Sequence, residues 1–244
     1  LRARYERDGR TADLVRLLDA EIALVDPKRQ AALHVEAGER LAAEGKATEA
    51  LVHFADALAL APADADVRAR LRSLAESTSQ QAKLVSVLEG LAGSVEDAAL
   101  RVGFRLESAS LRRGPLRDAA GAIDVLVAVL AEPALDGALV LATTRDLVDL
   151  YGATGRAEER LGMLEQLAGL ETDATRKRRI LGDAARLATE LGMPDRALSA
   201  WEQRLSTDPN DHEAVEAIVA LLEREERWEA LVAAIRRRFA RSTS

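Results

Sequence analysis

The sequence HVEAGERLAAEGKATEALVHFADALALAP, from His34 to Pro62, spaces its apolar residues as two amphipathic helices would. In its second half the apolar residues fall on one stripe of a 3.6-residue helix. They are Ala50, Leu51, Phe54, Ala57 and Leu58. Gly45 interrupts the pattern and Pro62 closes it, and both residue types punctuate regular structure. The stretch therefore predicts two helices joined by a turn at Gly45.

The same spacing returns near the other end of the chain, with Ala184-Ala185, Gly192, Ala197, Trp201 and Pro209. Both stretches resemble the tetratricopeptide repeat, a pair of antiparallel helices of about 34 residues. Similar breaks recur along the whole chain, at Gly9, Gly45, Ser79, Gly114, Gly155, Gly192 and Glu226. They predict seven repeats with approximate bounds 1–27, 28–63, 64–94, 95–134, 135–172, 173–209 and 210–240.

The resemblance implies an all-α, right-handed α-solenoid of about seven such helix pairs, with about 14 helices. We expect one domain over residues 1–244. Because the chain starts with Leu1 in mid-repeat, we also expect a fragment of a longer protein. Small residues at the close contact between paired helices alternate with leucine, which favours duplication of a four-helix unit. Repeats two, four and six have Ala50, Ala119 and Ala197 there, whereas the fifth has Arg160.

Composition narrows the function. Hydrophobic residues make up 48% of the chain, mostly Ala and Leu, and favour helices. The net charge of −7 is a poor match for a phosphate backbone, so we expect no nucleic-acid partner. No apolar run is long enough to span a membrane. The chain has no cysteine, which favours the cytoplasm but leaves the localisation open.

Motifs for catalysis, metals and cofactors are missing. His34, His53 and His212 lack the i, i+4 spacing of a helical zinc site. Neither a phosphate-binding Gly-x-x-x-x-Gly-Lys loop nor a Gly-x-Ser-x-Gly nucleophile motif occurs. Among 41 Asp and Glu residues no pair stands out as a general acid and base. We therefore expect no enzyme activity, no metal and no cofactor.

In tetratricopeptide repeats the first helix of each pair lines a concave groove that holds ligands. The resemblance places five candidate peptide-binding residues on that side, namely Arg101, Phe104, Arg145, Arg179 and Arg186. Arginine suits carboxylates, which leaves an acidic peptide as one ligand. The family's carboxylate clamp uses Lys and Asn where this chain has Val35 and Glu39, so binding of that type is not expected. Ordinary solvated charges are the alternative explanation for these arginines.

The leading hypothesis is thus a non-catalytic scaffold that binds a peptide or protein segment in the concave groove. A structural spacer or self-assembly segment of a larger multi-repeat protein is the alternative. A third possibility is regulation of a domain elsewhere in a longer chain.

Overall fold

A computed structural model describes residues 1–242, with side chains up to Arg236. The described residues form fourteen α-helices and no strand. The helices are α1 (Arg2–Arg7), α2 (Thr11–Ile22), α3 (Pro27–Ala43), α4 (Ala47–Leu60), α5 (Ala65–Ser77), α6 (Gln81–Ser94), α7 (Ala98–Arg113), α8 (Ala119–Leu130), α9 (Gly137–Ala153), α10 (Ala157–Leu170), α11 (Ala174–Glu190), α12 (Pro194–Thr207), α13 (His212–Arg224) and α14 (Trp228–Ser242). This confirms the predicted all-α class and its seven helix pairs.

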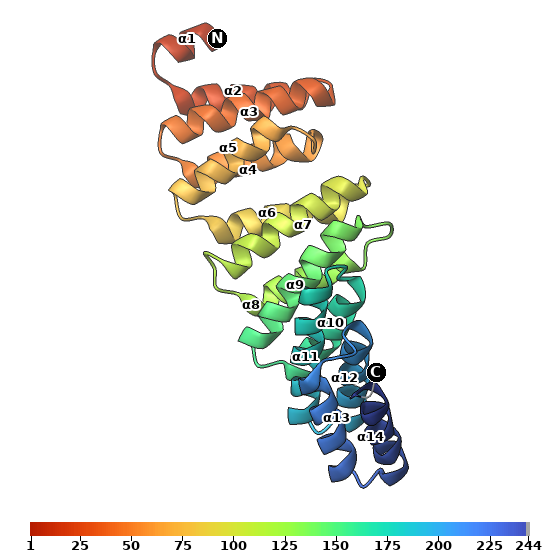
Figure 1. Ribbon diagram of the computed structural model, residues 1–244. Coiled ribbons are helices and arrows are strands. Elements are labelled where there is room, and N and C mark those ends of the chain that lie inside the picture. The colour runs from red at the N-terminus through yellow and green to blue at the C-terminus, as the bar shows by residue number, and fades with distance from the viewer. Residues whose placement is uncertain (243–244) are drawn as a thin grey trace. The chain divides into compact units, whose positions relative to one another are not determined.

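The chain divides into two compact units (Figure 1). Unit 1 covers residues 1–132 with α1 to α8, and unit 2 covers residues 133–244 with α9 to α14. Within each unit a helix packs mainly on the helix before it and the helix after it. The expectation of one continuous domain over residues 1–244 stays a prediction, because each unit is described by itself.

Six of the seven turns inside helix pairs share one backbone geometry. A residue with positive φ lies two positions after the last residue of each of these first helices. The N–H of the residue that follows it donates to the carbonyl five residues back, as in a Schellman motif. At Gly45, where φ is 75°, the N–H of Lys46 donates to the carbonyl of Leu41 over 2.9 Å. The six turn residues are Gly9, Gly45, Ser79, Gly155, Gly192 and Glu226. The breaks predicted at Ser79 and Glu226, where no glycine marks the turn, are confirmed.

The fourth turn differs from its prediction. Its positive-φ residue is Arg117, with φ 52°, whereas Gly114 has φ −87°. The prediction took the glycine as the break, but the chain makes a longer turn and reaches the left-handed conformation three residues later. The small residue at the helix contact is consequently Ala122, which is buried, and Ala119 is only half-buried.

Each first helix after α1 also begins in the same way. An aspartate precedes it and accepts hydrogen bonds from the backbone N–H groups of the first turn, which satisfies donors that the helix leaves free. These aspartates are Asp26, Asp64, Asp97, Asp136, Asp173 and Asp211. An aspartate therefore marks the start of these helices, and a left-handed residue follows their end. Together they determine which side chains of each helix face the core and which face solvent.

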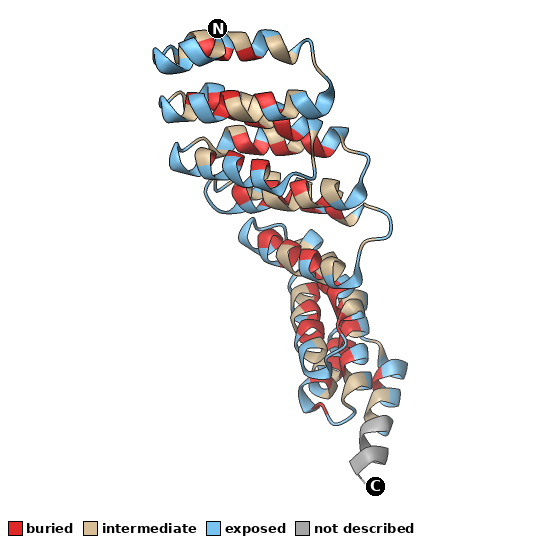
Figure 2. Ribbon diagram, turned by 90° about the horizontal axis from the view of Figure 1, so that it is seen from above, coloured by how far each residue is buried: buried red, intermediate tan, exposed pale blue. Residues whose placement is uncertain are grey.

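Buried residues lie where helices face their neighbours, and exposed residues lie on the outer sides of the ribbons (Figure 2). The contact between α3 and α4 shows how closely a pair can approach. A Cβ atom added to Gly38 would lie 2.9 Å from Cε1 of Phe54, so the phenyl ring occupies the space that a side chain at residue 38 would need. In unit 2, Trp201 of α12 is buried in the core.

Candidate interaction surface on the first helices

The five predicted binding residues all lie on first helices, but not in one unit. Arg101 and Phe104 are on α7 of unit 1. Arg145 is on α9, and Arg179 and Arg186 are on α11, both in unit 2. The structure therefore brings them together as two separate groups, and their side chains differ in what they contact.

Phe104 is a core residue, which corrects its placement in the groove. Its side chain has 0% exposure, and the guanidinium of Arg68 lies 4.7 Å above its ring centroid. Phe104 lies seven residues after Asp97, and the residues at the same distance after Asp26 and Asp173 are Leu33 and Ile180, which are also buried. A ligand cannot reach Phe104 in this arrangement.

Arg101 is held by an ion pair inside unit 1. Its Nε and Nη2 atoms donate to the two carboxylate oxygens of Glu132 over 2.7 and 2.8 Å, and Nη1 donates to the carbonyl of Val95. Glu132 also accepts from Arg105. The hydrogen bond from Arg101 is the main cause that holds the pKa of Glu132 below its usual value. Arg101 thus ties α7 to the segment after α8.

Arg145 has a comparable role in unit 2. Its Nη2 donates to Glu171 over 2.5 Å, just after the last residue of α10. Glu171 is buried and also accepts from the backbone N–H groups of Thr172 and Asp173. The N–H of Asp173, followed by the Arg145 guanidinium, lowers the pKa of the Glu171 carboxyl against the opposing effect of desolvation. Arg145 stabilises a connection between helices.

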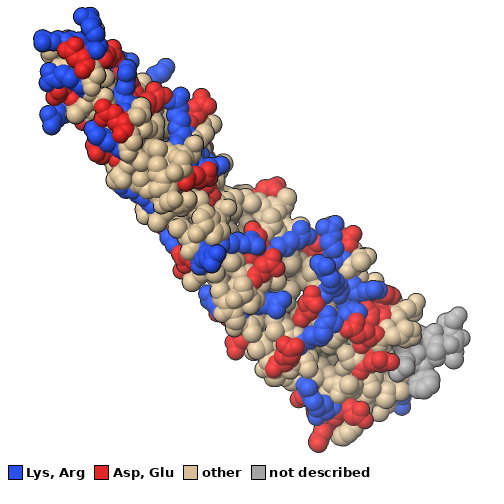
Figure 3. Space-filling model, turned by 90° about the vertical axis from the view of Figure 1, so that its left-hand side faces the viewer, with Lys and Arg blue, Asp and Glu red and all other residues tan. Residues whose placement is uncertain are grey.

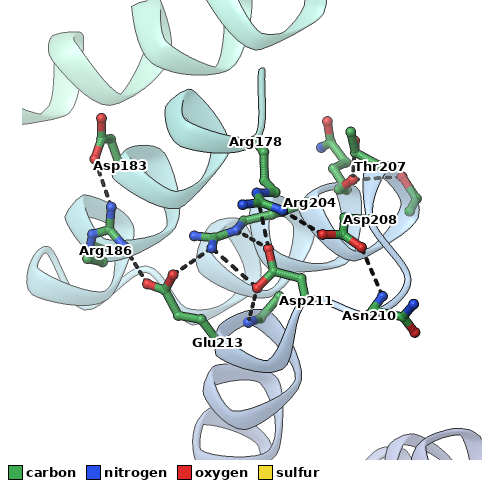
Figure 4. A network of polar contacts seen from close by, with 12 residues as sticks. Arg178, Asp183, Arg186, Arg204, Thr207, Asp208, Asn210, Asp211 and Glu213 are labelled. Carbon is green, nitrogen blue, oxygen red and sulfur yellow. Dashed lines mark hydrogen bonds and ion pairs between the residues drawn. The ribbon is translucent and has the colours of Figure 1, made fainter. Parts of the chain in front are cut away.

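The most extensive polar network of unit 2 centres on Arg204 of α12 (Figure 4). Its Nε donates to Asp211 over 2.7 Å, and its Nη2 donates to Glu213 over 2.5 Å. The guanidinium also lies 5.2 Å from the ring centroid of Trp201. Burial disfavours the charged form of Asp211, but the hydrogen bonds from Arg204 and a backbone N–H outweigh it, so the pKa of Asp211 is lowered. Two carboxylate partners make this buried cation tolerable, and the backbone N–H of Ala214 donates a further hydrogen bond to Asp211.

The arginines of α11 extend the network toward solvent. Arg186 donates to Glu213 over 2.6 Å and to Asp183 over 2.8 Å, and Arg178 donates to Asp208 over 2.5 Å. Arg186 therefore shares Glu213 with the buried Arg204 (Figure 4). On the face of the molecule that Figure 3 shows, acidic and basic groups lie side by side.

Arg179 is the exception among the five predicted residues. Its side chain is exposed, and within the described part of the chain it has no hydrogen bond or ion pair. It lies beside Arg178 on a helix where Arg178, Asp183 and Arg186 are held by ion pairs. A guanidinium that is free in this way can donate to a ligand without first breaking an intramolecular pair.

Sequence reasoning missed the buried network of Arg204, Asp211 and Glu213. One signal could have indicated it. Arg204 lies twelve residues after the turn residue Gly192, and the corresponding residue of the second repeat is Ala57, which is fully buried. The third, fourth and fifth repeats have buried apolar residues there, and an arginine at such a position needs buried carboxylates nearby.

The described residues contain no group of three or more His, Asp or Glu side chains that could hold a metal ion. His34 and His53 do meet, with their Nδ1 atoms 3.2 Å apart, but as a hydrogen-bonded pair. In the same described part, no helix combines the length and hydrophobicity that crossing a bilayer requires.

No model of a known protein family and no curated protein matches this sequence. Solved structures with a similar arrangement include Naa15/Naa10 bound to HypK-THB, with 17% identity and a TM-score of 0.48 over 98% of this chain. The chain spans 36% of the length of that protein chain. YrrB, a TPR protein with an unusual peptide-binding site, shares 12% identity at a TM-score of 0.39 over 76% of this chain and 90% of its own. A putative kinesin light chain with TPR-like repeats from Podosopora anserina shares 15% identity at a TM-score of 0.40, over 88% of this chain and 95% of its own.

The assignment of the fold rests on features of this chain and not on the similar structures. Its helices form consecutive pairs, its turns at Gly45 and Gly192 have left-handed geometry, and Gly38 packs against Phe54. These are the positions on which the resemblance in sequence depends. The fold is of the tetratricopeptide type. Residues 31–62 and 178–209 follow the pattern of this repeat most closely.

Proposed function

We propose that the chain is a non-catalytic scaffold, and that a protein segment binds along the exposed face of the first helices of unit 2. The observation that carries the proposal is Arg179, which α11 exposes with no intramolecular partner among the described residues. Neighbouring side chains are held in place by ion pairs, so this surface is largely pre-organised, and pre-organisation lowers the entropic cost of binding.

The charges of this face favour a segment that carries both signs, with a carboxylate opposite Arg179. Asp183 and Glu213 remain about half exposed despite their pairing with Arg186. A purely acidic peptide would bind more weakly, because these carboxylates repel it in part, whereas a segment with acidic and basic residues would complement the surface. This refines the acidic ligand suggested by the sequence.

Affinity capture followed by calorimetry tests the proposal. Proteins captured from a lysate by the immobilised chain would be truncated to find the segment that binds. The affinity of this segment would then be measured for the wild type and for Arg179→Glu. The matched control is Arg16→Glu, which makes the same charge change on the exposed arginine of α2 in unit 1. We expect the first variant to weaken binding and the control to leave it unchanged. Equal affinities for all three proteins would contradict the proposed surface.

Self-association remains a second candidate, because α14 exposes large apolar side chains. Trp228 is 57% exposed and Val232 is 46% exposed. Separately, α12, α13 and α14 line an open groove of about 750 Å³, with Leu198, Ile218 and Leu222 among its walls. Sedimentation of the wild type and of Trp228→Glu would test this function. A concentration-dependent dimer that the substitution abolishes would support it, and a monomer at high concentration would exclude it.

A further inference from the structure

Arg160 occupies a position that is apolar in every other repeat. It lies five residues after the turn residue Gly155, on α10. The residues five positions after the other turn residues are Leu14, Ala50, Leu84, Ala122, Ala197 and Leu231, and all are buried. At this point the second helix of a pair packs against the first. A cation there interrupts the packing that stabilises the other six pairs.

Gly152 of α9 makes room for this arginine. A Cβ atom added to Gly152 would lie 3.2 Å from Nε and 3.4 Å from Cζ of Arg160, so the guanidinium lies flat against the backbone of the helix. Five other repeats carry a side chain at the equivalent position, three residues before the turn. These are Glu6, Ala42, Glu76, Thr189 and Glu223. The fourth repeat has Gly114 there but combines it with Ala122, so only the fifth repeat combines a glycine with an arginine.

The guanidinium of Arg160 is left without a partner in the described part of the chain. Its Nε is buried and makes no hydrogen bond, and no carboxylate pairs with it. Five other described arginines have side chains at most 25% exposed, and each holds at least one carboxylate. They are Arg68, Arg101, Arg105, Arg112 and Arg204. A buried donor without a partner is costly, and such a departure from local rules is typical of a functional site.

We propose that Arg160 binds a carboxylate of an acidic side chain in the protein segment that unit 2 holds. The inference rests on the proposed function and adds a second contact to it. The Nε and Nη edge of a guanidinium matches a carboxylate with two parallel hydrogen bonds. The edge becomes available when the side chain lifts from Gly152, and no ion pair within the described residues opposes that movement.

Nuclear magnetic resonance of the arginine Nε–Hε groups tests the contact directly on the full chain. The probes are acetylated, amidated hexaglutamate and hexaglutamine, and inorganic phosphate forms a third arm. The signal of Arg160 is assigned by its loss in Arg160→Lys. We expect hexaglutamate to move it downfield in a saturable manner and hexaglutamine to leave it in place. No shift with hexaglutamate, or an equal shift with phosphate, would overturn the carboxylate assignment.

Replacement by alanine separates a binding role from a structural one. Alanine is the residue of repeats two, four and six here, so Arg160→Ala is expected to keep or raise the urea midpoint of unit 2. It is also expected to weaken hexaglutamate binding about 10-fold, the scale of a charge-assisted hydrogen bond. The control Arg196→Ala removes an arginine that Glu165 already holds, and its affinity should match the wild type.

A lower midpoint with unchanged affinity in Arg160→Ala would make Arg160 a structural residue and overturn the inference. The proposed function would still stand or fall on Arg179→Glu, which changes a different side chain and is read with a different ligand.

Discussion

Two glycine-to-alanine substitutions in unit 2 should change its stability in opposite directions. Gly155 has φ +70° at the turn between α9 and α10, whereas Gly162 lies inside α10. A Cβ atom added at either residue would meet nothing within 4 Å. Steric contact therefore plays no part, and only the backbone conformation distinguishes the two sites.

The magnitude follows from the two conformations. A left-handed conformation costs an alanine about 1 to 2 kcal/mol, and the smaller entropy of the unfolded chain returns about half of this, so Gly155→Ala should destabilise by about 1 kcal/mol. In a helix interior the same change stabilises by about 1 kcal/mol, which applies to Gly162→Ala. The variants should differ by about 2 kcal/mol, or about 1 M in urea midpoint.

Tryptophan fluorescence during urea unfolding is the assay. The chain has two tryptophans, Trp201 and Trp228, and both lie in unit 2, so the signal reports on that unit. Midpoints that move in the same direction for Gly155→Ala and Gly162→Ala would refute the assigned turn geometry.

Further predictions concern the same unit and the same assay. Glu226→Gly should stabilise by about 0.5 kcal/mol, because glycine relieves a left-handed residue with φ 57°, and a lower midpoint would contradict this. Arg204→Ala should destabilise unit 2 by about 3 kcal/mol, because the buried carboxylate of Asp211 loses its partner Arg204. Arg196→Ala removes an exposed pair and should cost less than about 1 kcal/mol. Similar losses of stability in the two variants would argue against the buried network. The lowered pKa of Asp211 stabilises unit 2 above the ordinary Asp pKa of about 4, and this is lost as the pH falls through the lower folded value. Asp211→Asn should therefore lose less stability than the wild type on acidification from about pH 5 to pH 2, and parallel curves would contradict this.

Sequence reasoning located the helices because apolar periodicity and turn residues are local properties. It found Ser79 and Glu226 as turn residues from spacing alone, without a glycine. It failed at Gly114, because glycine was weighted above the spacing of the repeat, and it failed at Phe104, which is a core residue. The recurring aspartate before each first helix, such as Asp97, was a further signal and would have helped to set the register of α7.

The candidate site was less accessible to the same reasoning. An exposed arginine and an ion-paired one look identical in a sequence, so Arg145 and Arg179 received the same interpretation although Glu171 holds the first. The carboxylate partners of Arg145 and Arg101 lie just beyond other helices, 26 and 31 residues away in the sequence. Charge pairing at that range depends on the packing of helices, which periodicity does not determine.

The neighbour-to-neighbour packing of the helices has a consequence for biosynthesis. Because the helices of each unit pack mainly on their neighbours in the sequence, a pair can become ordered while the next is still inside the ribosome. Contacts that are close in sequence also favour rapid folding. A nascent chain of this protein can thus acquire its structure in step with translation, and a stalled chain would carry complete, folded repeats from its first residue up to the ribosomal exit.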